Sequence, residues 1–196
     1  MRSTMTRFPD GMRAAGRCVG ALFFTIFGGC WLLLACAYAK RFDAVPVCSI
    51  AAVAILLATG ALRLRSRAAR VVEPSLPKEG KRRDDRVFGA INAVTYTAVF
   101  LLFLILPRFG LQNYIFPGFV LLVGLHFFPM PPFYQHGANL VTGGFMVVWA
   151  VVCAVAFRAD GNRMAAFVAG GAGVALWLSA GWALRTAGAL LARAGV

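Results

Sequence analysis

The two histidines of the chain are its side chains best suited to acid–base or ligand chemistry, and both lie in one short stretch. The segment VGLHFFPMPPFYQHG, residues 123–137, contains His126, His136 and three of the nine prolines. Histidine changes its charge near neutral pH, so it can exchange a proton or bind a ligand. The surroundings of His126 are therefore the first candidate for a functional site.

A metal or haem site is not indicated by these histidines. His126 and His136 are ten residues apart across a proline-rich turn, with no carboxylate between them. Zinc normally takes three or four protein ligands. The chain also lacks the HExxH and CxxCH signatures, a glycine-rich phosphate loop and a nucleophile elbow. We expect no metal, no cofactor and no catalytic residue.

The five cysteines do not change this expectation. None belongs to a CxxC pair, their number is odd, and all lie in or beside apolar runs. Such a pattern gives no disulfide framework. Buried cysteine usually packs as a small hydrophobic residue, and we assign these five no chemistry.

Composition indicates a membrane protein. Hydrophobic residues make up 60% of the chain and charged residues 14%, against about 45–50% and about 25% in a soluble domain. The formal net charge of +13 could suggest nucleic acid. However, the basic residues flank apolar runs and form no domain of their own. We expect no nucleic-acid partner, and attraction to anionic lipids instead.

Six apolar spans predict an all-α bundle of six transmembrane helices in one integral membrane domain. A helix needs roughly 20 apolar residues to cross a ~30 Å hydrocarbon core, and it satisfies its own backbone hydrogen bonds in lipid. Pro107 and Pro129 close the third and fourth spans. The spans cover about residues 18–39, 45–62, 87–106, 111–128, 138–157 and 164–184.

The distribution of lysine and arginine predicts the orientation. A basic loop at about residues 63–86, together with both chain ends, carries fifteen basic residues, against five in the loops of the other side. The positive-inside rule then places both termini in the cytoplasm. Cleavage of the first span as a signal peptide, at ACAYAK, is the alternative. The apolar run of about 20 residues is longer than the usual 7–15, which favours an uncleaved helix.

This topology brings polar residues from four segments to the cytoplasmic end of the bundle. One interpretation is a polar pocket centred on His126 that binds a ligand. The other is that polar residues gather at helix ends because headgroups and water lie there, and we favour this second interpretation. The candidate pocket residues are Asn92, Tyr96, His126, Tyr134, Asn139 and Thr142.

The sixth span carries small residues at every fourth position. Small residues let helix backbones approach closely in lipid, so this face predicts helix packing. Packing within the chain is favoured over a dimer interface, although a homo-oligomer or another membrane partner stays open. The small face consists of Gly171, Ala175, Ser179 and Ala183.

Three segments resemble a group of small bacterial multi-pass inner-membrane proteins that has no assigned activity. They are FGAIN at 88–92, VGLHFFP at 123–129 and LVTGG at 140–144. The resemblance implies a bacterial plasma (inner) membrane protein and singles out Asn92, His126 and Thr142. After the proline this chain has MPPFYQHGAN, where the group would have a basic residue and a YY pair.

Three functions are compatible with these observations. The first is a non-enzymatic integral membrane protein with a structural or partner-binding role. The second is a small transporter or channel for a neutral or small solute. It predicts a cavity lined by Asn92, Tyr96 and His126. The third is an enzyme acting on a lipid-soluble substrate, which requires further polar groups near His126. No charged residue lies deep in a span, which disfavours a proton-coupled pump.

Overall fold

The computed structural model describes residues 10–70, 78–130 and 136–195, apart from the side chains of residues 78–85 and 136. Within these residues the chain is all helical, without a strand, and this confirms the predicted all-α class. Two short 3-10 turns, η1 (Leu106–Phe109) and η2 (Gln112–Tyr114), precede the fourth helix. The helices are α1 (Asp10–Tyr38), α2 (Ala44–Ala69), α3 (Lys78–Ile105), α4 (Ile115–His126), α5 (His136–Ala156) and α6 (Gly161–Arg193).

Five of the six helices (α1, α2, α3, α5 and α6) are long and apolar enough to cross a membrane, which fits a membrane-spanning protein. The exception is α4. Its 12 residues extend only about 18 Å at 1.5 Å per residue, well short of a ~30 Å core. Of the six predicted spanning helices, five are therefore long and apolar enough to cross a membrane within the described residues. Residues 111–114, expected at the start of the fourth span, lie in η2 and its entry instead.

The turn before α4 has a local explanation. Pro107 occupies the start of η1, where its missing N–H costs nothing. Gly110 then adopts a left-handed conformation with φ of 70°, which ends η1. Before α6, the Asp160 side chain accepts a hydrogen bond of 3.0 Å from the Arg163 N–H and caps the helix. These residues set where α4 and α6 begin.

The basic segment is more helical than expected. The sequence predicts a loop at about residues 63–86, but α2 continues to Ala69 and α3 already begins at Lys78. The run LRLRSRAA is rich in leucine, arginine and alanine, which are good helix formers. Arg67 also lies in the last turn of α2, where a cation favours the helix dipole.

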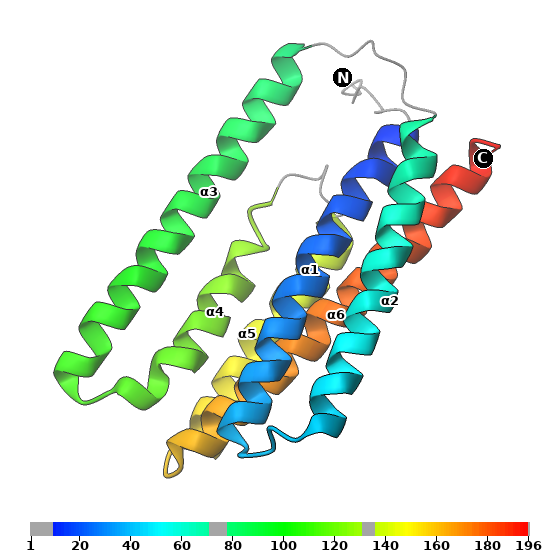
Figure 1. Cartoon of the computed structure of the whole chain (residues 1–196). Helices are drawn as coiled ribbons and strands as arrows, with labels where there is room; N and C mark the ends of the chain where they lie inside the picture. Colours follow the sequence, from blue (N-terminus) through cyan, green and yellow to red (C-terminus); the bar gives the residue numbers. More distant parts are fainter. Residues whose placement is uncertain (1–9, 71–77, 131–135, 196) are drawn as a thin grey trace.

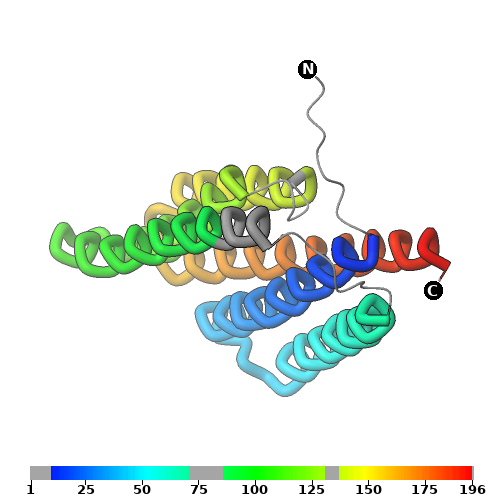
Figure 2. The backbone as a smooth tube through the Cα atoms, turned by 90° about the horizontal axis from the view of Figure 1, so that it is seen from above, coloured from blue at the N-terminus to red at the C-terminus, as the bar shows by residue number. Residues whose placement is uncertain are grey.

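The helices place their basic termini at one end of the molecule. The beginnings of α1 and α3 and the ends of α2 and α6 lie together there (Figure 1). We call this the basic end, because the following residues lie in or next to these helix termini: Arg13, Arg17, Arg65, Arg67, Arg70, Arg185 and Arg193. Helix α2 borders α1 on the side away from α4 and α5 (Figure 2). Helix α3 lies on the opposite side of the molecule from α2 (Figure 1).

Glycine allows α1 and α6 to pack very closely. A Cβ atom added to Gly173 would lie 2.8 Å from the carbonyl oxygen of Gly28, and one added to Gly28 would lie 3.0 Å from that of Gly173. Next to this crossing, the Trp177 indole Nε1–H donates a 3.0 Å hydrogen bond to the carbonyl oxygen of Thr25. We call these four residues the α1–α6 interface. Such small-residue contacts are typical of helices packed in lipid.

The short helix α4 is held by a similar glycine pair and in turn carries α3. A Cβ atom on Gly143 of α5 would lie 2.6 Å from the carbonyl oxygen of Gly124. Helix α3 packs mainly against α4, where the rings of Phe103 and Phe119 meet edge to face with centroids 6.2 Å apart. Much of α3 stays uncovered, and Val94 is 70% exposed.

Candidate functional site

A cavity of about 590 Å³ lies between α1, α3 and α4, with contributions from α5 and α6. We call it the α1–α3–α4 cavity. Six polar or charged side chains line it: Arg17, Asn92, Thr95, Tyr96, His126 and Asn139. Aromatic side chains form most of the remaining surface, chiefly Phe23, Phe24, Phe27, Trp31, Phe88, Phe119 and Phe127.

The polar and aromatic groups occupy different depths of this cavity. Helix α1 begins at the basic end, so Arg17 lies near that end and Trp31 lies 14 residues further in, about 21 Å along the helix. Helix α4 runs toward the basic end, so its last residue, His126, is nearer to that end than Phe119. The polar side chains therefore lie in the part of the cavity nearer to the basic end, where Phe88 and Phe127 also line it, and the deeper part is aromatic and aliphatic.

His126 is oriented by a hydroxyl group of α3. Its Nδ1 lies 2.9 Å from Oγ1 of Thr95, and the same Oγ1 lies 2.9 Å from the carbonyl oxygen of Ile91. Because a hydroxyl carries one proton, both bonds form together only when Thr95 donates to the carbonyl and accepts from Nδ1–H. In a neutral imidazole this arrangement leaves Nε2 as an acceptor. No described residue occupies Nε2.

Two further polar groups line the cavity without an intramolecular partner among the described residues. Arg17 of α1 is half-buried and forms neither an ion pair nor a hydrogen bond there. The acidic residue of the first turn, Asp10, pairs instead with Arg13 at 3.5 Å. The amide of Asn92 is likewise unpaired. Both groups are thus available to a ligand or to water.

Asn139 belongs to this cavity although it comes from α5. Its side chain is 4% exposed, and its Nδ2 donates to the Met130 sulfur at 3.6 Å. Both residues line the cavity. The polar end of the cavity is therefore built by α1, α3, α4 and α5 together.

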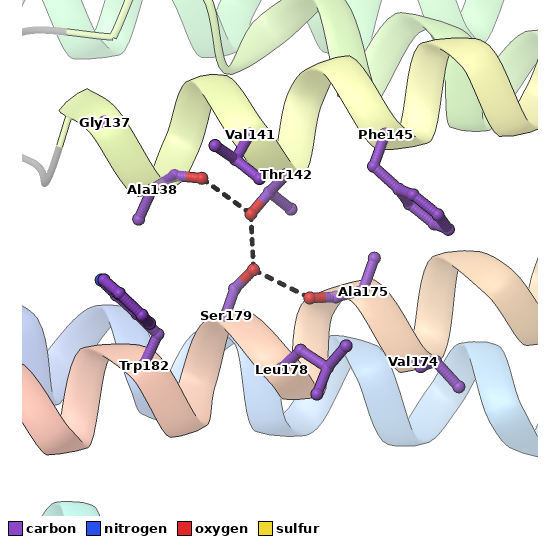
Figure 3. A pocket seen from close by; sticks show the side chains of 10 residues that line it. All are labelled: Gly137, Ala138, Val141, Thr142, Phe145, Val174, Ala175, Leu178, Ser179 and Trp182. Carbon is purple, nitrogen blue, oxygen red and sulfur yellow. Dashed lines mark hydrogen bonds between the residues drawn. The ribbon is translucent and has the colours of Figure 1, made fainter.

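A second hollow lies between α5 and α6 and contains a pair of hydroxyl groups (Figure 3). This α5–α6 groove has a volume of about 550 Å³. Oγ1 of Thr142 and Oγ of Ser179 lie 2.5 Å apart, and each also lies within 2.9 Å of a carbonyl oxygen of its own helix. The two hydroxyl groups have only two protons for these three contacts, so both protons are already used within the pair and its own helices. Because the pair joins α5 to α6, its role is helix packing.

The predicted pocket residues divide between these two hollows. Asn92, Tyr96, His126 and Asn139 line the α1–α3–α4 cavity, whereas Thr142 lines the α5–α6 groove. Thr142 lies three positions after Asn139, so its side chain is turned about 60° around α5, and α6 packs against α5 on that side through Ser179. Asn139 thus faces the cavity and Thr142 faces α6. Tyr134 lies outside the described residues.

The small residues of α6 also contact more than one neighbour. Gly171 lies under the indole of Trp149 of α5. At the other end of the row, Ala183 belongs to a buried cluster with Ala21 of α1 and Ala61 of α2. Positions four residues apart drift about 40° per step around a helix. The small face therefore turns from α5 toward α1 and α2, and these contacts are within the chain.

Sequence reasoning missed Arg17 and the aromatic part of the cavity. Arg17 was expected to lie just outside the first span and to contribute only to orientation, but α1 begins at Asp10 and includes it. The spacing of Gly16, Gly20, Phe23, Phe27 and Trp31 at three or four residues places them on one helix face. This periodicity was the signal that could have revealed the cavity side of α1.

Comparison with known proteins finds no matching family model, no matching curated protein and no matching solved structure. The resemblance of residues 88–144 to a group of bacterial membrane proteins thus stays a prediction. Among the residues that the structure describes, no three histidine, cysteine or acidic side chains are grouped to hold a metal ion. The function must be inferred from the cavity itself.

Proposed function

We propose that this chain is a non-enzymatic integral membrane protein that binds an amphiphilic, lipid-soluble molecule in the α1–α3–α4 cavity. The observation that carries this proposal is the division of the cavity into a polar end, with Arg17, Asn92 and His126, and a deeper aromatic part. A cavity of about 590 Å³ is within the range of ~300–1,000 Å³ that holds small organic ligands. An amphiphile matches both parts.

Binding without catalysis is favoured by the groups around His126. An imidazole beside a hydroxyl could act as a base toward a nucleophile, but a third group normally orients the imidazole. Thr95 also bonds the Ile91 carbonyl, and none of the described residues lining the cavity carries a carboxyl group. These features support a binding site in which His126 is a polar contact.

The same proposal places the chain in a bacterial inner membrane with its basic end toward the cytoplasm. The support is the excess of arginine at that end, which follows the positive-inside rule. Reporter fusions test the orientation. A cytoplasmic reporter should be active after residue 75 and inactive after residue 160, and the reverse result would overturn the orientation.

Ligand binding is tested with a brominated probe, because bromine quenches tryptophan fluorescence on contact and Trp31 lines the cavity. The full chain would be reconstituted in phosphatidylcholine nanodiscs and titrated with a dibrominated C18 chain, as the free acid or the methyl ester. We expect at least one form to quench a component of the emission that is absent in Trp31→Phe.

A cavity-filling variant provides the matched control. A Cβ atom on Gly20 meets no atom within 4 Å, and Gly20 lines the cavity, so Gly20→Phe should obstruct the cavity and remove the Trp31 component. Gly181 of α6 is similarly unobstructed but lines neither hollow, so Gly181→Phe should leave that component intact. Equal quenching in both variants, or none with either probe, would refute the proposed binding.

A small transporter that uses the same cavity is a second candidate. The observation that favours it is that α3, which forms one side of the cavity, is held mainly through α4. Movement of α3 with α4 would open the cavity. In proteoliposomes, transfer of the brominated acid between leaflets should be faster with the wild-type chain than with Gly20→Phe. Equal rates would leave binding as the function.

A further inference from the structure

We propose that Arg17 makes the α1–α3–α4 cavity selective for an anionic amphiphile, with a carboxylate or phosphate headgroup at Arg17 and an apolar chain toward Trp31. The inference rests on the proposed function and adds the charge of the ligand. It follows from the position of Arg17, from the Asn92 amide in the same cavity lining and from the aromatic side chains that continue along α1.

Arg17 is the one fixed charge among the described residues that line the cavity. It is half-buried and has no ion-pair partner within the described chain. A guanidinium removed from bulk water is best stabilised by a carboxylate or phosphate, which it can bind with two parallel hydrogen bonds. No acidic side chain in the cavity lining supplies that partner, so an anionic ligand would supply it.

Arg17 differs from its neighbour Arg13 in that it lines the cavity and has no ion-pair partner within the described chain. Arg13 lies one turn earlier on α1, does not line the cavity, and pairs with Asp10 at 3.5 Å. Its side chain is 43% exposed. Two arginines one turn apart on α1 thus have different surroundings, and only Arg17 lines the cavity.

A second hydrogen-bond donor in the cavity lining comes from α3. The Asn92 side chain lines the same polar end and has an unpaired amide among the described residues. A carboxylate or phosphate accepts several hydrogen bonds. Arg17 and Asn92 would therefore hold the headgroup from two helices. With a neutral headgroup, the guanidinium would have only the charge of Asp10, which lies beyond ion-pair distance, to compensate it within the described chain.

The remaining surface fits an apolar chain. From Arg17, the side chains of Phe23, Phe27 and Trp31 follow along one face of α1 and line the cavity. The stretch from Arg17 to Trp31 is about 21 Å along the helix, which accommodates an extended fatty-acyl chain. The headgroup would lie at the basic end, where an anionic headgroup is attracted by neighbouring cations.

The test compares charged and neutral forms of one chain in the nanodisc titration. At a pH of about 8 a carboxylic acid is ionised, so the dibrominated acid is an anion and its methyl ester is neutral. The wild-type chain should bind the acid about tenfold more tightly than the ester, as expected for a charge-assisted hydrogen bond. Arg17→Gln should reduce the difference to about twofold or less, while Arg17→Lys should keep part of it.

Arg13→Gln is the matched control, because it removes a neighbouring charge outside the cavity and should preserve the difference. Inorganic phosphate, as a headgroup without a chain, should not displace the brominated acid. Unchanged thermal unfolding of Arg17→Gln would establish that the variant is folded. If Arg17→Gln unfolds at a lower temperature than the wild-type chain, the difference in binding between acid and ester is compared in Arg17→Lys and Arg13→Gln instead.

Several results would overturn the inference while leaving the proposed function intact. Equal binding of acid and ester by the wild-type chain would remove the charge selectivity. An equal loss in Arg13→Gln would reduce the effect to surface attraction. Displacement by inorganic phosphate would indicate a site for a free anion. If neither acid nor ester quenches Trp31, the proposed function itself fails.

Discussion

The two sides of α1 use glycine in opposite ways. On one side, Gly28 meets Gly173 of α6, and neither has room for a side chain, because a Cβ atom would approach the opposite backbone to 3.0 Å or less. On the other side, Gly20 faces the α1–α3–α4 cavity, and a Cβ atom there meets nothing within 4 Å. In lipid, backbone contact replaces the hydrophobic effect as a source of helix association. The same residue type thus builds an interface on one side and leaves space on the other.

The largest effect is expected where the backbones touch. Gly173→Val places a branched side chain against the Gly28 carbonyl, which cannot move without separating α1 from α6. We expect the free energy of unfolding to fall by about 1–3 kcal/mol, the usual cost of overpacking. Thermal unfolding in detergent measures it. The control is Gly181→Val on the same helix, where a Cβ atom meets nothing within 4 Å. Equal losses in both variants would contradict the close contact.

The hydrogen bond of the α1–α6 interface should contribute less. Trp177→Phe removes the 3.0 Å bond to the Thr25 carbonyl and should lower the free energy of unfolding by about 1 kcal/mol. Trp182→Phe is the comparison, because Trp182 is 57% exposed and should change stability very little. The interface assignment would be wrong if Trp182→Phe were the more destabilising change.

On the cavity side of α1, a larger side chain in place of glycine should raise the free energy of unfolding instead of lowering it. Gly20→Ala adds a methyl group where no atom is near and improves helix propensity, so stability should rise by about 0.8 kcal/mol. Gly28→Ala, two turns along the same helix, should lower it. Chemical or thermal unfolding of the two variants side by side checks the prediction. A loss of stability in Gly20→Ala would mean that the cavity is already occupied by protein.

The smallest effect is expected at the polar end of the cavity. Thr95→Val removes the hydroxyl partner of His126 Nδ1 but keeps the side-chain shape, and the cavity leaves room for another partner. We expect a loss of about 0.6 kcal/mol or less, the typical value for such bonds in membranes. Nitrogen NMR of His126 should report a changed tautomer equilibrium. Thr97→Val on the exposed side of α3 should leave the His126 signals unchanged.

The sequence determined the class of the protein and the end at which its polar residues gather. Long apolar runs favour helices because a helix satisfies its backbone hydrogen bonds within one segment in lipid, and α1, α2, α3, α5 and α6 are long and apolar enough to cross a membrane. Antiparallel order then brings Asn92, His126 and Asn139 to one end. The spacing of small residues at every fourth position likewise predicts helix packing along α6.

Which of these residues share a site depends on the packing of the helices against one another. The contacts that define the interface and the cavity join distant positions: Thr25 with Trp177 across 152 residues, and Thr95 with His126 across 31. The rotation of each helix depends on such contacts. A turn of about 60° around α5 separates Thr142 from Asn139, and the early start of α1 brings Arg17 into the cavity. Local propensity sets a helix and its length, whereas packing among several helices sets the direction of each side chain.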